Sequence, residues 1–185
     1  MAMRSGVTDG TPQAIVFGPG EVLVNYSVGY GTGTSLGATL GGATFDPGVS
    51  LRNVEVDGLP GPTKGLVHKD AVAPTLVVRL KEMTQDNLTR AIAGAVQSAQ
   101  SGEDNHIIGG PIDDASYLEN VALVAENQAG EEMVVIIYNA LATAVSAVNF
   151  PDKGEPVLEV TFTGHFDLAD LESEPWRIIA IPEGS

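Results

Sequence analysis

Short runs of alternating apolar and polar residues, separated by glycine and proline, recur along this 185-residue chain. In residues 155–167, Leu158, Val160 and Phe162 alternate with Glu and Thr. Because successive side chains of a β-strand point to opposite faces, this period of two is typical of strands with one buried face. The chain lacks the strand-helix alternation of parallel α/β proteins, which indicates a different architecture.

The pattern predicts a mostly-β fold, a β-sandwich or barrel with one flanking α-helix. The expected strands, about nine or ten, cover residues 14–18, 21–26, 43–46, 51–58, 73–83, 117–127, 131–141, 143–150, 155–167 and 176–181. A Gly-Pro-Gly turn at 18–20 separates the first two, and Gln-Ala-Gly at 128–130 predicts a hairpin. In residues 73–83, we expect Leu76, Val78 and Leu80 to face the core, and Val77, Arg79 and Lys81 to face outward.

One helix is expected, over residues 85 to about 99. Thr84 is a suitable N-cap, because its hydroxyl can accept a hydrogen bond from an unpaired backbone N–H, and Asp86 lies in the first turn near the positive end of the helix dipole. Four apolar residues then share one helical face: Leu88, Ile92, Ala95 and Val96.

Length and composition favour one domain. A chain of this length with 43% hydrophobic residues can bury a core, and we expect a single domain over residues 13–185. Residues 1–12, rich in Ser, Thr, Gly and Pro, are expected to form a flexible N-terminal arm. The sequence has no cysteine, no signal-peptide pattern and no apolar run of about 18 residues, so we expect no disulfide and no membrane span.

The net charge of −15 is concentrated in the second half of the chain. Residues 1–90 carry 8 acidic and 7 basic side chains, whereas residues 91–185 carry 16 acidic ones against Lys153 and Arg177. Tight binding of nucleic acid depends on Lys and Arg displacing counterions from phosphates. We therefore expect DNA to pass this protein without specific binding.

Two sequence motifs are weak candidates for ligand sites. The segment GYGTGTSLG at 29–37 approaches a phosphate-binding loop, but it lacks the third glycine and the strand-to-helix context. Asp113, Asp114 and Glu119 could bind a hard cation, but their spacing matches no calcium loop. We predict a plain loop and ordinary acidic turn residues, with no cofactor or metal site.

Histidine chemistry is equally sparse. His68, His106 and His165 are too scattered to predict a metal triad. His165 with Asp167 and Ser173 has the residue types of a catalytic triad, yet Ser173 lies in no nucleophile elbow. We predict no catalytic residue, and hence no enzyme.

Three segments in order along the chain carry a family resemblance. Residues 35–66 combine a Leu-Gly-Ala-Thr-x-Gly-Gly opening, an acidic strand ending in Asp-Gly and a Gly-Pro-x-Lys-Gly loop. Residues 73–95 run from a strand into a helix start, and residues 160–178 contain Thr-Gly-His-Phe-Asp and then Pro-Trp. In this combination the chain resembles the tail tube proteins (major tail proteins) of long, non-contractile-tailed bacteriophages, the siphoviruses.

The resemblance implies a structural virion protein whose copies close into hexameric rings, which stack head to tail as the tail tube. In such rings, one sheet of each subunit joins a ring-wide β-barrel around a lumen through which DNA passes during genome ejection. Implied partners are further copies of the chain, the tape measure protein and the tail tip and terminator proteins. The implied location is the virion tail, assembled in the host cytoplasm.

We expect acidic residues to line that lumen, since they would repel DNA. The candidates are those on or beside the long acidic strands: Glu119, Glu126, Glu131, Glu132 and Glu159. The N-terminal arm and the loops at 27–42 and 59–72 are expected to make contacts between subunits. Tubes of gene transfer agents or contractile injection machines remain alternatives, as does a monomeric β-sandwich binding module on a virion or cell surface.

Overall fold

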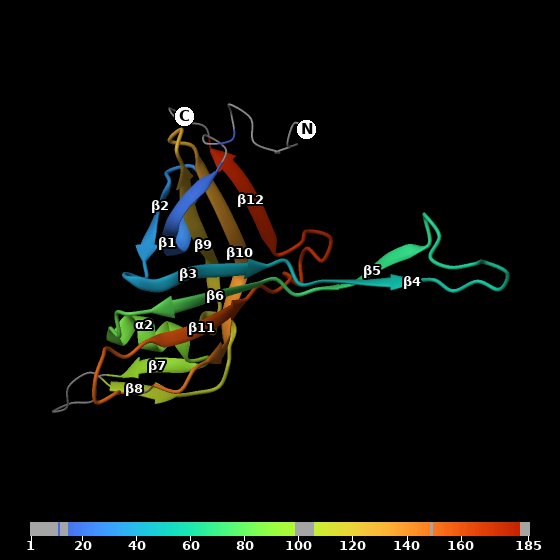
Figure 1. Ribbon diagram of the computed structural model, residues 1–185. Coiled ribbons are helices and arrows are strands. Elements are labelled where there is room, and N and C mark those ends of the chain that lie inside the picture. The colour runs from blue at the N-terminus through green and yellow to red at the C-terminus, as the bar shows by residue number, and fades with distance from the viewer. Residues whose placement is uncertain (1–10, 12–14, 99–105, 149, 182–185) are drawn as a thin grey trace.

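The protein is mostly β in a computed structural model, which describes residues 11, 15–98, 106–148 and 150–181 (Figure 1). Within these residues there is one α-helix, α2 (Gln85–Ala91), and one 3-10 turn, η1 (Asp114–Ser116). The strands are β1 (Val16–Ser27), β2 (Thr32–Ser35), β3 (Thr39–Asp46), β4 (Val49–Asn53), β5 (Val67–Val72), β6 (Thr75–Leu80), β7 (Ala95–Ser98), β8 (His106–Gly109), β9 (Leu118–Asn127), β10 (Glu132–Val145), β11 (Leu158–Thr163) and β12 (Trp176–Ile181).

Eight strands form the main sheet, which is antiparallel throughout. Its order is β2-β1-β9-β10-β11-β6-β3, and β12 also pairs with β10. The first part of β10, residues 132–140, pairs with β9, and its other side pairs with β12, whereas residues 141–145 pair with β11. We call the strands β2, β1, β9, β12 and the first part of β10 the β9 section, and β3, β6, β11 and the rest of β10 the β6 section.

The strand β10 changes partners at a strained residue. Asn139 has a φ of +46°, a left-handed conformation that most side chains avoid. Its side-chain amide donates a hydrogen bond to the carbonyl of His165 at 3.1 Å, and the backbone N–H of His165 donates to the carbonyl of Tyr138. These bonds hold the chain after β11 against β10 at the point where the two sections meet.

Apolar side chains from both sections meet in one core. Val22, Val24 and Val121 come from the β9 section, and they cluster with residues of β6 and β11. The β6-section members at the centre are Leu76, Val78, Leu80, Leu158, Val160 and Phe162, each at most 1% exposed. The predicted inward faces of these two strands are thus confirmed, and each such side chain contributes about 1.5–3 kcal/mol through burial.

The helix begins as predicted and ends early. The Thr84 hydroxyl accepts the backbone N–H of Asn87, which confirms the N-cap. Instead of reaching residue 99, however, the helix stops at Ala91, and residues 95–98 form β7, paired with β8. The turn between α2 and β7 needs a glycine at position 94. Its φ is +71°, and a Cβ there would lie 2.5 Å from the backbone oxygen of Gly110. Ile92 and Val96, expected on a buried helical face, are therefore exposed.

Other predicted boundaries were also wrong. Residues 14–18 and 21–26 were expected as two strands, but β1 runs through Gly18 and Gly20 as an irregular stretch, both glycines having positive φ. The predicted break before residue 143 is absent, since β10 continues to Val145. The expected loops at 27–42 and 59–72 contain β2, the start of β3 and β5. The N-terminal segment 1–12, predicted to be flexible, lies outside the described residues, apart from Thr11.

Buried Asn87 explains why the LGATLGG segment is held against the helix start. Its side-chain amide donates to the carbonyls of Leu36, at 2.8 Å, and of Glu82, at 3.0 Å. The Glu82 carboxylate in turn accepts the backbone N–H of Ala38 at 2.8 Å. Gly37 has a φ of +82°, and a Cβ there would overlap that carboxylate. The glycine is thus required by both its backbone conformation and this close approach.

The bend of β10 gives a direct prediction. We expect Asn139→Val to destabilise the protein by about 3 kcal/mol, because it combines left-handed strain at a β-branched residue with loss of the hydrogen bond to His165. Asn139→Gly loses the same bond without the strain, so we expect about 1 kcal/mol. Urea unfolding curves measure both, and equal destabilisation by the two substitutions would contradict the assigned strain.

Candidate assembly surfaces

A long hairpin of β4 and β5 extends from the body of the protein (Figure 1). All of β4 and five of the six residues of β5 are exposed. The apolar side chains of Leu51, Val56 and Val67 are 63%, 50% and 46% exposed. An isolated two-stranded hairpin is marginally stable in water, so this hairpin and its connecting loop, residues 49–72, here called the arm, fit a surface that another chain covers.

The arm is electrically neutral, unlike the rest of the chain. It contains three basic residues, Arg52, Lys64 and Lys69, and three acidic ones, Glu55, Asp57 and Asp70. Across the strands, the Arg52 Nε donates to the Asp70 carboxylate at 2.9 Å. In a protein with a net charge of −15, a neutral apolar arm can approach a second copy with little electrostatic repulsion.

The β6 section ends in two unpaired strand edges. Within the described residues, β3 pairs with β6 on one side and with no strand on the other. At the opposite end, residues 141–145 of β10 pair with β11 alone, because the pairing with β9 stops at Ala140. Gly41 and Gly42, both with φ of +78°, form an irregularity in β3 where its register shifts. Open edges of this kind can pair with strands of other chains.

The outward face of the β6 section is polar. Opposite the core-facing residues, β6 and β11 carry Thr75, Val77 and Arg79 alongside Glu159, Thr161 and Thr163. The Arg79 Nε lies 2.6 Å from a Glu159 carboxylate oxygen, and the hydroxyls of Thr143 and Thr163 lie 2.6 Å apart. The section therefore has one face in the core and one suited to water.

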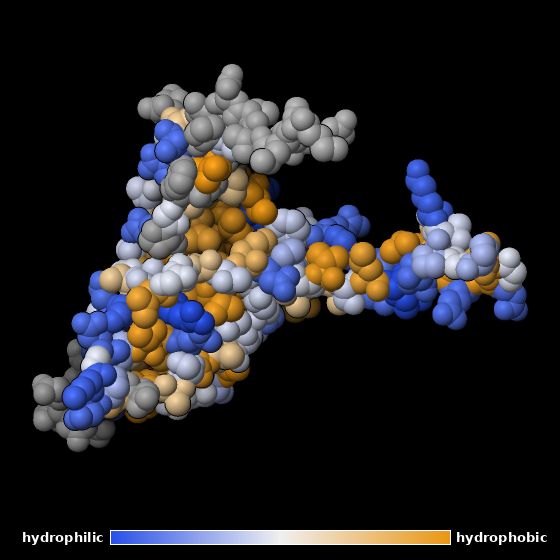
Figure 2. Space-filling view, viewed as in Figure 1, coloured by the Kyte–Doolittle hydropathy of each residue, from blue (hydrophilic) through white to orange (hydrophobic). Residues whose placement is uncertain are grey.

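The β9 section leaves apolar surface uncovered. Ile137 and Trp176 lie opposite each other and pack on the core. On the same face, farther from that core, Met133 and Ile178 are 40% and 50% exposed. Figure 2 shows apolar surface in the recess above β3, between the strands labelled β1 and β12 in Figure 1. This is a second surface where another polypeptide could pack.

The five lumen candidates do not share one face. Glu159 lies on β11 in the outward face of the β6 section. The other four lie on β9, on β10 or in the turn between them: Glu119, Glu126, Glu131 and Glu132. Glu126 and Glu132 are opposite partners at the hairpin end, so like charges face each other there. The positions of acidic residues in the sequence do not indicate which of them lie in the β6 section and which in the β9 section.

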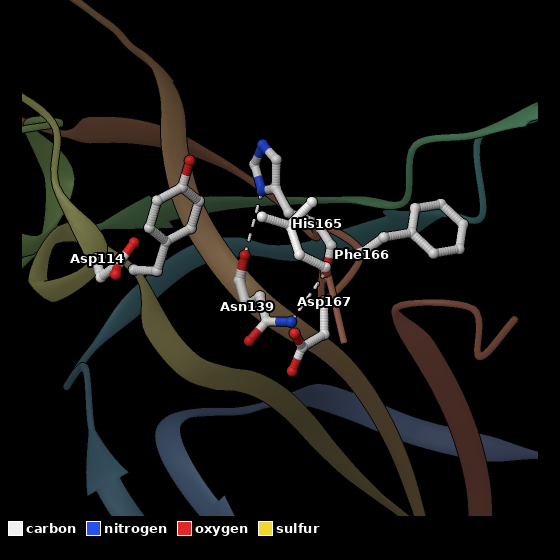
Figure 3. A pocket seen from close by; sticks show the side chains of 7 residues that line it. Asp114, Asn139, His165, Phe166 and Asp167 are labelled. Carbon is white, nitrogen blue, oxygen red and sulfur yellow. Dashed lines mark hydrogen bonds between the residues drawn. The ribbon is translucent and has the colours of Figure 1, made fainter. Parts of the chain in front are cut away.

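A cleft surrounds the bend in β10 (Figure 3). It measures about 470 Å³ and is lined by Asp114, Tyr117, Asn139, His165 and residues 166–168. The His165 Nδ1 lies 3.1 Å from the Asn139 carbonyl oxygen, and the Tyr117 ring meets the imidazole edge to face at 5.2 Å. Since a carbonyl only accepts, the imidazole donates this bond, which ties His165 to the bend.

The weak catalytic and metal patterns have structural explanations in these contacts. The Ser173 hydroxyl donates to Asp170 at 2.7 Å rather than to His165, which helps lower the pKa of the Asp170 carboxyl. Asp113 caps η1 by accepting the backbone N–H of Ser116. The 29–37 segment forms a turn and β2. Among the described residues, no group of three or more acidic or histidine side chains is arranged to hold a metal ion.

No family model matches the chain, and no curated protein is significantly similar to it. Within the part of the chain that the structure describes, no helix has the length and apolar character needed to cross a membrane.

Sequence reasoning missed two features of these surfaces. The arm was expected as a strand at 51–58 and a loop at 59–72, and nothing in its composition indicated that it would leave the body. The ion pairs between Arg79 and Glu159 and between Lys81 and Glu155 were also missed. Their signal was present, since both cations and Glu159 fall on the outward positions of alternating strands, but the pairing of β6 with β11 had to be known.

Proposed function

We propose that the protein is the subunit of a tail tube, in which copies close into hexameric rings that stack head to tail. The observation that carries the proposal is the β6 section, with one polar face, one buried face and, among the described residues, an unpaired edge at each end. The family resemblance of residues 35–66, 73–95 and 160–178 supplies the ring of six and the tail as its location. Such a subunit is a structural virion component assembled in the host cytoplasm.

The two free edges make a closed ring physically reasonable. β3 and the second part of β10 are different strands at opposite ends of the section, so a contact between them is head to tail rather than two-fold. Repeating that contact leads either to a closed ring or to an open filament. Closure would pair both of these edges and merge the β6 sections into a ring-wide β-barrel around a lumen. In this arrangement each subunit is a β-sandwich with α2 on its flank.

The polar face of the β6 section would then line the lumen, because its other face is occupied by the core. Among the acidic candidates, Glu159 has the support of lying on this face. Glu119, Glu126, Glu131 and Glu132 belong to the β9 section, and their support rests on charge alone. The net charge of −15 supports passage of DNA without specific binding.

The arm supports contacts between rings or between neighbouring subunits. Its apolar, neutral surface is suited to bind a second copy, while the tape measure, tail tip and terminator proteins are the other partners that the resemblance implies. The uncovered apolar face around Met133 and Ile178 is a further candidate for contact with a neighbour.

Disulfide trapping tests the edge contact, because the chain has no native cysteine. We expect a variant with Thr44→Cys in β3 and one cysteine at position 143, 144 or 145 in β10 to give, on oxidation, a covalent ladder that ends at the hexamer. The ladder is measured on non-reducing gels. Each single-cysteine variant is the control and should stop at a dimer. A double variant that also stops at a dimer at all three positions would contradict the proposed ring.

A charge placed on the arm should separate folding from assembly. Leu51 is 63% exposed, so we expect Leu51→Asp to change the free energy of unfolding by less than about 0.5 kcal/mol while strongly reducing polymer formation. Asn53→Asp adds the same charge to the same arm without removing an apolar contact, and should assemble nearly normally. Thermal unfolding and sedimentation velocity measure the two properties. Normal polymerisation of Leu51→Asp would exclude the arm as an assembly contact.

A further inference from the structure

The outward face of the β6 section carries two cations, and each is bound by a carboxylate. Arg79 and Glu159 are direct partners in the register of β6 and β11, and the Arg79 Nε lies 2.6 Å from the Glu159 carboxylate. Lys81 follows β6 in the same alternation, and its ammonium group donates to Glu155, just before β11. The first pair crosses from β6 to β11, and the second joins the residue after β6 to the segment that leads into β11.

These pairs are too exposed to have a large effect on folding. The side chains of Arg79 and Glu159 are 54% and 43% exposed, and those of Lys81 and Glu155 are 24% and 79% exposed. Ion pairs at exposed sites contribute little to stability, because water and salt screen them and the side chains lose entropy. Their main consequence is local: a carboxylate cancels the field of a cation at the point where that cation faces solvent.

The other strand residues of this face include no cation. These are mainly threonines, namely Thr44, Thr75, Thr143, Thr161 and Thr163, with Val77, Asp46, Leu141 and Ala144. Gly41 has no side chain, so β3 covers no part of Arg79 at this point. A Cβ at Gly41 would lie 3.6 Å from the Arg79 guanidinium. The described strands therefore present mainly hydroxyls on this face, and the two cations that it carries are already paired.

We propose that Glu159 and Glu155 mask Arg79 and Lys81, so that this face gives a polyanion such as DNA no cation to bind. The inference rests on the proposed function, which puts the face on the lumen. Each Lys or Arg contact with phosphate adds affinity through counterion release. A free arginine repeated by every subunit along a tube would add such contacts along the whole path of the DNA. Masking each cation within its own subunit prevents this cumulative retention.

A reactive cysteine on the face measures the masking directly. Thr161 is two residues from Glu159 on the same strand, about 7 Å along it, and the chain contains no other thiol. In Thr161→Cys protein, the rate of reaction with dianionic dithiobis(nitrobenzoate), divided by the rate with neutral dithiodipyridine, reports the local potential. This ratio can be measured on the full chain in any state of assembly.

We expect Glu159→Gln to raise that ratio at least about three-fold at low salt, because one negative charge at this distance is lost. Salt at about 1 M should remove the increase. Adding Arg79→Gln should return the ratio to its starting value, because the positive charge is then removed together with the negative one and the net charge of the pair is again zero. Glu126→Gln removes an equal charge from β9 and is the matched control. Equal ratios for Glu159→Gln and Glu126→Gln would overturn the masking.

Retention of DNA by assembled rings tests the polyanion itself. Rings of Glu159→Gln protein should retain a fluorescent DNA duplex at low salt and release it as salt rises, whereas wild-type and Arg79→Gln/Glu159→Gln rings should not. Rings of Glu159→Gln that retain no more DNA than wild-type would overturn the role toward DNA even if the thiol ratio rises. If the wild-type protein forms no rings, the result counts against the proposed function. The thiol ratio then still decides whether the cations are masked.

Discussion

The whole architecture depends on one strand, β10, serving two sections of sheet. Its first part is enclosed by β9 and β12, and its last residues pair with β11 alone. The change of partner requires the left-handed conformation of Asn139 and the hydrogen bonds that join it to His165. Because the pairing with β9 ends there, no strand in the described part of the chain pairs with that side of the second part of β10. The same bend therefore brings the two halves of the core together and creates one of the two edges available for assembly.

Charge and polarity are distributed in a way that favours association between copies of the chain. The neutral arm and the uncovered apolar face of the β9 section are surfaces for other polypeptides, whereas the outward face of the β6 section has hydroxyls and paired charges. A protein with a net charge of −15 resists association between its acidic surfaces, so contacts should concentrate where charge is balanced. The tail tube proposal gives each of these surfaces a role: the arm and the apolar face contact other polypeptides, and the polar face lines the lumen.

Local signals in the sequence predicted the fold better than they predicted the surfaces. The alternation of Leu158, Val160 and Phe162 correctly gave the buried face, because burial on one side of a strand dictates that period. The helical pattern through Val96 failed because the chain turns at Gly94 into β7, which pairs with β8, a tertiary requirement that outweighs an apolar period. The scattering of the glutamate candidates and the pairing of Arg79 with Glu159 depend on which strands are neighbours. Strand order is a long-range property that no local pattern contained.

Electron microscopy of the concentrated, purified protein, with mass photometry of the same sample, tests the central claim most directly. The account predicts hollow rings or tubes with a central channel, and ring particles whose mass is six times that of the chain. Particles that remain monomeric at every concentration, also after addition of a tail tip complex, would contradict it. In that case a monomeric β-sandwich module that binds at a virion or cell surface would become the better explanation.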